Sequence, residues 1–248
     1  MVLEEMLNYL QDCSIKMISS AEWSEKQGLL VVPSYNLLEM LEDVCEEHMS
    51  LSDYVQQQRQ ELQNLSNDDV WRKIAESNLF HLEPELRNLN GKGFEEIYKL
   101  SSSNTINDSF LDEAYIESTV SSFELDKAWI NERNEYEEEQ VIVMSLPKET
   151  AFEAALWMPM GGFNECPLPL YQAAIMKKWQ EQYDAKPIAV TQDSWILRAE
   201  GSPATFEEAL VLAKEHVLFC QYVLEEFSTI GEYADYLMKE SVWYFWWD

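Results

Sequence analysis

Basic residues are scarce in this chain. Lysine and arginine together number 17, aspartate and glutamate number 46, and the formal net charge is −29. A charge of that sign and size repels phosphate groups and anionic membrane surfaces, so we expect neither direct nucleic-acid binding nor membrane binding. It attracts a basic protein partner over long distances. The simpler explanation is that the acidity confers solubility.

Long hydrophobic runs and cysteine are also in short supply. No apolar stretch approaches the ~20 residues that cross a bilayer. The opening segment, Met1 to Met6, is acidic where a secretion signal is basic. Four scattered cysteines are too few for a disulfide framework. We therefore expect a cytoplasmic protein, and the nine tryptophans predict a packed core rather than a disordered chain.

Recognised catalytic signatures are missing as well. The sequence contains no phosphate-binding glycine loop, no dinucleotide fingerprint and no serine nucleophile elbow. We expect no cofactor, and the sequence leaves open whether the protein is an enzyme.

Residues 1–139 are predicted to form a mainly helical, acidic region, with 30 acidic and 10 basic residues. Helical periodicity and turn signals divide it further. We expect helices at 2–11, 35–49, 51–64, 67–77 and 109–120, strands at 14–18 and 29–32, and a surface loop at 101–104.

Residues 140–248 are predicted to form a second, α+β domain, because short β-branched runs appear after Gln140. The order of elements is β, α, β, β, α, α, β, with strands at 141–146, 188–191, 195–198 and 243–247 and helices at 149–157, 170–183, 205–226 and 229–239. This order resembles a ferredoxin-like split βαβ arrangement, with the last strand inside the sheet. The chain as a whole is therefore expected to be α+β.

Three segments carry a family resemblance. They are Gly161-Gly162-Phe163-Asn164-Glu165-Cys166-Pro167, the stretch from Trp179 to Ile188, and the closing Trp243-Tyr244-Phe245-Trp246-Trp247-Asp248. In this order they resemble the bacterial domain-of-unknown-function 4253 family, over about residues 141–248. Phe163 stands where that family usually has Trp, and Cys220 is not followed by its usual Pro-Asp. The resemblance implies no activity, because the family has none established.

The Gly161–Pro167 loop holds most of the candidate catalytic residues. Cys166 lies just before a predicted helix, whose N-terminus can lower a thiol pKa and make the sulfur nucleophilic. Asn164 and Glu165 could orient a base or substrate, and His216 could act with the thiol. The alternative is a structural loop in which Cys166 is a small buried apolar group.

His216 and Cys220 are four residues apart on one predicted helix and share a face. With Cys166 they would be the ligands of any zinc site, but the chain has no Cys-x-x-Cys pair and no evident fourth ligand, so we predict no metal site. Trp243, Trp246 and Trp247 are the candidate binding residues, because tryptophan is enriched at interfaces.

Arg198 lies in a mostly apolar predicted strand and needs a carboxylate partner. We expect Glu215 or Asp248 to supply it. Two functional hypotheses remain, beside a purely structural or oligomeric role for the aromatic C-terminus. The first is a non-catalytic binding protein for a basic protein, similar to an immunity protein or an inhibitor. The second is an enzyme of unknown reaction with its site at the Gly161–Pro167 loop and His216, which requires an accessible Cys166.

Overall fold

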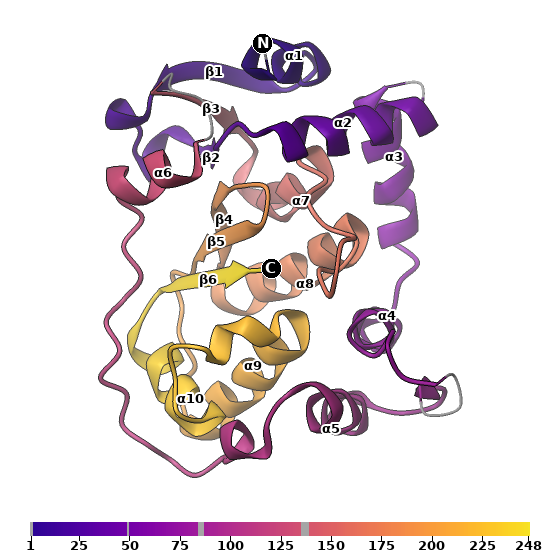
Figure 1. The fold of residues 1–248 in the computed structure, drawn as a ribbon, viewed down its shortest axis with the longest axis vertical. Helices are drawn as coiled ribbons and strands as arrows, with labels where there is room; N and C mark the ends of the chain where they lie inside the picture. Colours follow the sequence, from indigo (N-terminus) through magenta and orange to yellow (C-terminus); the bar gives the residue numbers. More distant parts are fainter. Residues whose placement is uncertain (1, 49, 84–86, 135–138) are drawn as a thin grey trace.

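The computed structural model describes residues 2–48, 50–83, 87–134 and 139–248. It confirms a mixed α+β protein, in which one sheet is flanked by helices (Figure 1). Within the described ranges, no helix is long and apolar enough to cross a membrane.

The sheet has six strands in the order β1-β3-β2-β4-β5-β6. Neighbouring strands are antiparallel except β2 and β4, which are parallel. The strands are β1 (Ser14–Ser19), β2 (Leu29–Val31), β3 (Gln140–Ser145), β4 (Lys186–Val190), β5 (Ser194–Arg198) and β6 (Val242–Trp246).

Strand β2 lies inside the sheet although it comes from the acidic N-terminal region. Leu30 pairs with Val143 on one side and with Ala189 on the other. All three residues of β2 are buried, as expected of a short apolar run with a strand on each side. The sheet therefore takes strands from both sides of residue 140.

The expected ferredoxin-like arrangement is not confirmed. Strand β2 separates β3 from β4, and β6 pairs only with β5 at the edge of the sheet rather than inside it. Sequence order alone gives no information about a strand inserted from a distant segment, and this is why the expectation failed.

Helices from both regions pack on one face of the sheet around a single large core, which includes Leu41, Trp71, Trp179, Phe219 and Phe245. Serine or threonine side chains cap several of these helices by accepting backbone N–H groups of the first turn, for example Ser34 from Leu37 N–H and Thr205 from Glu208 N–H. The helices are α1 (Val2–Tyr9), α2 (Tyr35–Glu47), α3 (Leu51–Leu62), α4 (Asn67–Asn78), α5 (Phe94–Thr105), α7 (Ala154–Trp157), α8 (Pro169–Tyr183), α9 (Phe206–Phe219) and α10 (Ile230–Lys239).

The opposite face of the sheet is covered by α6 (Lys127–Arg133) and by Phe123 and Leu125. These two residues belong to residues 112–126, here called the strap. The strap runs as extended chain past α10 and up the side of the molecule (Figure 1). Ile130 of α6 is buried in a second, smaller core with Ile188 and Ile196.

Three hydrogen bonds made by backbone groups of the strap hold it to α10, one to a backbone group of the helix and two to its side chains. Gly231 N–H donates to Asp112 O at 3.1 Å, and Ser118 N–H donates to Asp235 Oδ2 at 2.7 Å. Phe123 N–H donates to the hydroxyl of Tyr236 at 3.4 Å. A Cβ atom on Gly231 would lie 2.0 Å from Ala114 O, so only glycine permits this close approach.

The structure corrects three predicted elements. Residues 101–104 belong to α5 rather than to a surface loop, and Ser101 and Ser102 are buried. The expected helix at 109–120 is only the short 3₁₀ helix η4 (Asp108–Leu111), followed by the strap. Helix α9 ends at Phe219, and η6 (Gln221–Leu224) follows it after a break at Cys220. A further 3₁₀ segment, η5 (Lys148–Glu153), begins the predicted helix at 149–157.

Candidate functional site

The Gly161–Pro167 loop is built around a buried glutamine. Gln172 Nε2 donates to Met160 O and to Pro167 O, each at 2.7 Å. Gly161 has a φ of 133°, and a Cβ there would lie 2.2 Å from Gln172 Nε2. The glycine thus lets the backbone close tightly over the glutamine, which is a structural role.

Cys166 is buried, with only 2% of its surface exposed. Its Sγ lies 3.8 Å from Met160 Sδ and 3.5 Å from Gln172 Nε2. Burial raises the pKa of this thiol well above its ordinary value, so the sulfur is protonated at neutral pH. The feature expected of a nucleophile, an accessible thiolate beside a base, is not found at this position.

His216 is fully buried in an aromatic cluster. Its Nδ1 lies 2.8 Å from the hydroxyl of Tyr233, and the rings of Trp179 and Trp243 pack against it at 4.5 and 4.6 Å between centroids. Burial lowers its pKa well below the ordinary value, so the imidazole is neutral. Its Nε2 has no hydrogen-bond partner among the described residues.

Cys220 is buried as well, and its thiol donates to Trp246 O at 3.0 Å. Burial raises the pKa of this thiol to about 12. Cys166, His216 and Cys220 therefore each serve a separate packing contact. Within the described parts of the chain, no group of three or more histidine, cysteine, aspartate or glutamate residues is placed to hold a metal ion.

Asn164 and Glu165 lie at the surface end of the same loop. Asn164 has a left-handed backbone, with φ of 44°, and its Nδ2 donates to the carbonyl oxygen of Asp248. This bond ties the loop to the end of β6. Glu165 is half-buried. Asn164 thus joins the first and last of the three motifs that carry the family resemblance.

The ion pairs differ from the expectation for Arg198. Its guanidinium forms two hydrogen bonds, each 2.6 Å long, with the carboxylate of Glu25. Glu215 instead pairs with Lys178 and accepts from Trp179 Nε1 at 2.9 Å. Glu215 and Asp248, the expected partners of Arg198, were therefore wrong. Glu25 lies in the segment before β2, far from Arg198 in the sequence, and no local pattern predicts that the two side chains meet.

Strand β6 divides its aromatic residues between the two faces of the sheet. Trp243, Phe245 and Trp247 are buried in the large core, where Phe245 stacks on Trp179 at 5.4 Å with an interplanar angle of 9°. Tyr244 and Trp246 point to the opposite face and are half-buried. This alternation follows from the two-residue period of a strand. Of the three predicted binding tryptophans, Trp246 lines a pocket, whereas Trp243 and Trp247 are buried in the core.

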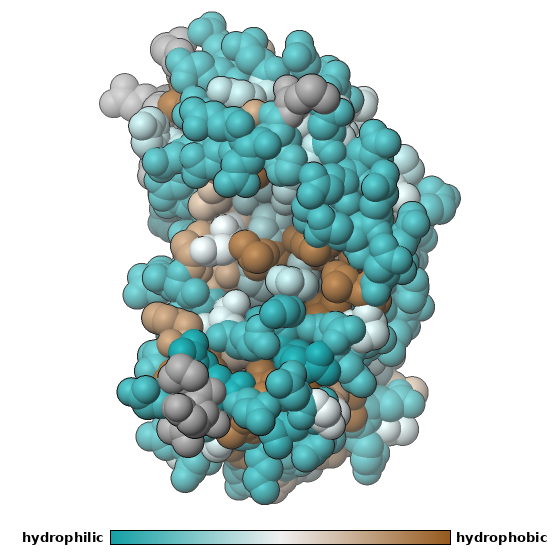
Figure 2. All heavy atoms as spheres, turned by 90° about the vertical axis from the view of Figure 1, so that its right-hand side faces the viewer, coloured by the Kyte–Doolittle hydropathy of each residue, from teal (hydrophilic) through white to brown (hydrophobic). Residues whose placement is uncertain are grey.

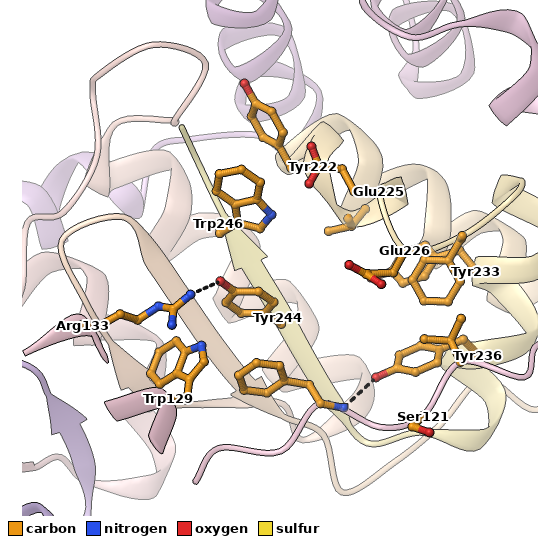
Figure 3. A pocket seen from close by; sticks show the side chains of 14 residues that line it. Ser121, Trp129, Arg133, Tyr222, Glu225, Glu226, Tyr233, Tyr236, Tyr244 and Trp246 are labelled. Carbon is orange, nitrogen blue, oxygen red and sulfur yellow. Dashed lines mark hydrogen bonds between the residues drawn. The ribbon is translucent and has the colours of Figure 1, made fainter. Parts of the chain in front are cut away.

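That pocket has a volume of about 390 Å³ and lies between β6, the strap, α6 and the η6–α10 region (Figure 3). Aromatic rings form most of its wall. Phe123 stacks on Tyr244 at 4.5 Å with an angle of 15°, and Tyr222 packs against Trp246 at 4.9 Å. The aromatic side chains that line it are Phe123, Trp129, Tyr222, Phe227, Tyr233, Tyr236, Tyr244 and Trp246.

Three charged side chains join this aromatic wall. Arg133 lies over the ring of Trp129, 4.2 Å from its centroid, and donates to the Tyr244 hydroxyl at 3.2 Å. Glu225 and Glu226 line the pocket beyond Trp246 and Tyr244, and Figure 3 shows the Glu226 carboxylate directed toward β6. Neither glutamate has an ion-pair or hydrogen-bonding side-chain partner in the described parts of the chain.

Sequence reasoning missed most of this pocket. Glu225 and Glu226 were assigned to the end of a long helix, and the strap that supplies Phe123 was predicted to be partly helical. A signal was present, because alternation along β6 separates Trp246 from Trp243 and Trp247. Nothing in the sequence places Phe123 or Trp129 beside that strand.

A second hollow lies between α2, α3 and the loop from Pro159 to Tyr171. Asp43, Glu47 and Glu61 are among the residues around it, and Leu168 is 52% exposed there. Figure 2 shows the face at the right of Figure 1, which is largely hydrophilic, with hydrophobic side chains gathered in a hollow across its middle.

Residues 142–248 match the model of a family described as Domain of unknown function (DUF4253). This confirms the resemblance that the three motifs indicated. The match includes most of β3 and all of β4, β5 and β6, but neither β1 nor β2. A search of the curated proteins finds no match to the chain, and neither does a search of the solved structures.

Proposed function

We propose that this protein is a non-catalytic, cytoplasmic binding protein for a basic protein partner, in the manner of an immunity protein or an inhibitor. The observation that carries the proposal is the excess of carboxylates. With 46 acidic and 17 basic residues, most of the acidic side chains have no cation within the chain to pair with. Such a surface accelerates association with a positively charged protein and disfavours anionic partners.

The aromatic pocket supports the same proposal. Tyrosine and tryptophan are enriched where proteins bind other proteins, because their rings offer a large apolar area with a polar edge. Here such rings adjoin two glutamates that have no cationic partner among the described residues. A basic partner would supply the missing positive charge.

Native mass spectrometry of the protein isolated gently from its own cells at low salt tests the proposal. We expect a stoichiometric complex with a basic protein, and we expect that complex to dissociate as salt is raised. An unrelated protein of similar net charge, taken through the same isolation, is the control for nonspecific attraction. Isolation of the chain bare, or with an acidic partner, would contradict the proposal.

The alternative proposal, an enzyme with its site at the Gly161–Pro167 loop and His216, has less support. Cys166 is 2% exposed and protonated, and His216 contacts Tyr233 rather than a thiol. In the folded protein, Cys166 and Cys220 should react with a thiol reagent only on the timescale of unfolding. Rapid labelling of Cys166 in the native state would revive this alternative.

A further inference from the structure

The aromatic pocket has the composition of a receptor for a positively charged group. A cation over the face of an aromatic ring is attracted by the ring quadrupole, and the attraction grows when the site is partly withdrawn from water. Tyr222, Tyr244 and Trp246 are all half-buried, so part of each ring is accessible to a ligand and part is shielded from water. A cation bound there would contact rings on several sides.

The charges in the pocket favour a cation over an anion. Glu225 and Glu226 lie on one wall and Arg133 on another, so the lining carries one more negative than positive charge. Arg133 is already engaged, with its guanidinium over Trp129 and a hydrogen bond to Tyr244. The glutamates have no such engagement in the described parts of the chain, which leaves their oxygens available to accept hydrogen bonds.

Arg133 also indicates which cation suits this wall. Its planar guanidinium lies 4.2 Å from the Trp129 ring centroid and donates to the Tyr244 hydroxyl. A guanidinium stacks on flat rings and donates two parallel hydrogen bonds to a carboxylate, whereas an ammonium behaves as a compact, strongly hydrated point charge. The same aromatic wall can hold a second guanidinium on its glutamate side.

The pocket is held open by elements that pack elsewhere. The thiol of Cys220 donates to Trp246 O, which fixes η6 against the end of β6. The hydroxyl of Tyr236 accepts from Phe123 N–H and donates to Val242 O at 3.3 Å, which fixes the strap against the start of β6. These contacts place the two walls before any ligand arrives, and such preorganisation lowers the cost of binding.

We propose that the pocket between β6, the strap and η6 binds an arginine side chain of the partner, with the guanidinium stacked on the aromatic rings and paired with Glu225 and Glu226. This rests on the proposed function and adds to it the chemistry that the partner must present. The volume of about 390 Å³ falls in the range of pockets that take small ligands or single side chains.

The test uses N-acetyl-arginine methylamide as the probe, followed by the indole N–H resonances in NMR spectra of the full chain. We expect saturable shifts of the Trp246 and Trp129 indoles. The citrulline analogue, which has the same shape without the charge, should bind about tenfold more weakly or not at all. Equal binding of both probes, or no shift of these indoles, would overturn the proposal.

Substitutions that remove the carboxylate charges but keep the side-chain shape test the role of those charges in binding. The double variant Glu225→Gln and Glu226→Gln should weaken binding of the arginine probe about tenfold, whereas Glu181→Gln, at an exposed position on α8, should leave it unchanged. Unchanged binding in the double glutamate variant, or an equal loss in Glu181→Gln, would overturn the proposal.

The same double variant distinguishes this inference from the proposed function. If it still captures a basic partner in a salt-sensitive complex, but the arginine probe does not bind the wild-type pocket, only the pocket assignment fails. If no basic partner is captured by either form, the proposed function fails whatever the probe does.

Discussion

At the scale of single residues, three polar side chains buried in the large core each make a local contact within the fold, although His216 Nε2 has no hydrogen-bond partner among the described residues. Gln172 holds the Gly161–Pro167 loop, Cys220 holds the end of β6, and His216 contacts Tyr233. Of the candidate catalytic residues, Cys166 and His216 are packed in this core, whereas Asn164 and Glu165 lie at the surface end of the loop. Glu225 and Glu226, which have no ion-pair partner among the described residues, line the aromatic pocket instead.

His216 should make folding stability depend on pH. Because burial lowers its pKa in the folded state, the unfolded chain binds a proton there that the folded chain does not, once the pH falls below the unfolded value of about 6.5. Stability should then fall by about 1.4 kcal/mol per pH unit for this one proton. We expect His216→Phe to remove that part of the pH slope in denaturation measured between pH 7 and pH 5.

Tyr233→Phe is the matched control for this prediction. It removes the hydroxyl that contacts His216 but keeps the imidazole buried, so the pH slope should remain. An unchanged slope in His216→Phe would show that other groups account for the acid sensitivity.

At the scale of elements, β6 has a core face and a pocket face. Trp243 is buried against Trp179 and His216, whereas Trp246 is half-buried beside Tyr222. Trp243→Ala should lower the free energy of unfolding by about 3–5 kcal/mol because it leaves a cavity in the core. Trp246→Ala should cost clearly less. Urea denaturation of both variants checks this, and equal losses would contradict the assignment of faces.

The strap is the second element with a testable role, because Asp235 holds it to α10. Although burial raises the pKa of this carboxyl, hydrogen bonds from Lys239 and from Ser118 N–H lower it overall, so the charged form is favoured. Asp235→Ala removes the acceptor of Ser118 N–H. We expect amide hydrogen exchange in residues 115–123 to become about tenfold faster.

Glu207→Ala, at an exposed position in the first turn of α9, is the control for the strap experiment. It should leave the exchange rates of residues 115–123 unchanged. If Asp235→Ala also leaves them unchanged, the hydrogen bond from Ser118 N–H to Asp235 contributes nothing measurable to holding the strap.

At the scale of the whole molecule, the sheet joins the two halves of the chain. Strand β2 pairs with both β3 and β4, and Arg198 of β5 pairs with Glu25. Residues 140–248 expressed alone would lack β2, so β3 and β4 would have no partner between them. We expect this fragment to show no cooperative thermal unfolding, in contrast to the full chain. A sharp transition in the fragment would show that it folds independently.

Local patterns in the sequence predicted most elements but not their assembly. Apolar periodicity located α2, α8 and α10, and the short β-branched runs located β2 and β3, because these signals are encoded within each segment. The position of β2 inside the sheet depends on contacts between distant segments, which no local pattern records. The strap was predicted to be partly helical from its local sequence pattern. Its contacts with α10 depend on the tertiary structure, so the local pattern could not predict its extended conformation.

The candidate site was less predictable than the fold for the same reason. Trp246 was identified, but Phe123 and Trp129 approach it from segments more than 100 positions earlier in the chain, as the stacking of Phe123 on Tyr244 shows. Glu225 and Glu226 carry no motif. Cys166 was a candidate nucleophile because it precedes a predicted helix. Its burial makes the thiol unreactive, and burial is a property of the tertiary structure that the sequence does not show.

The central claim, binding of a basic protein through an acidic surface, is tested most directly by measuring the dissociation constant of the captured partner as salt concentration is varied. The account predicts that affinity falls steeply as salt rises, because screening weakens attraction between exposed opposite charges. An affinity that is indifferent to ionic strength would contradict it.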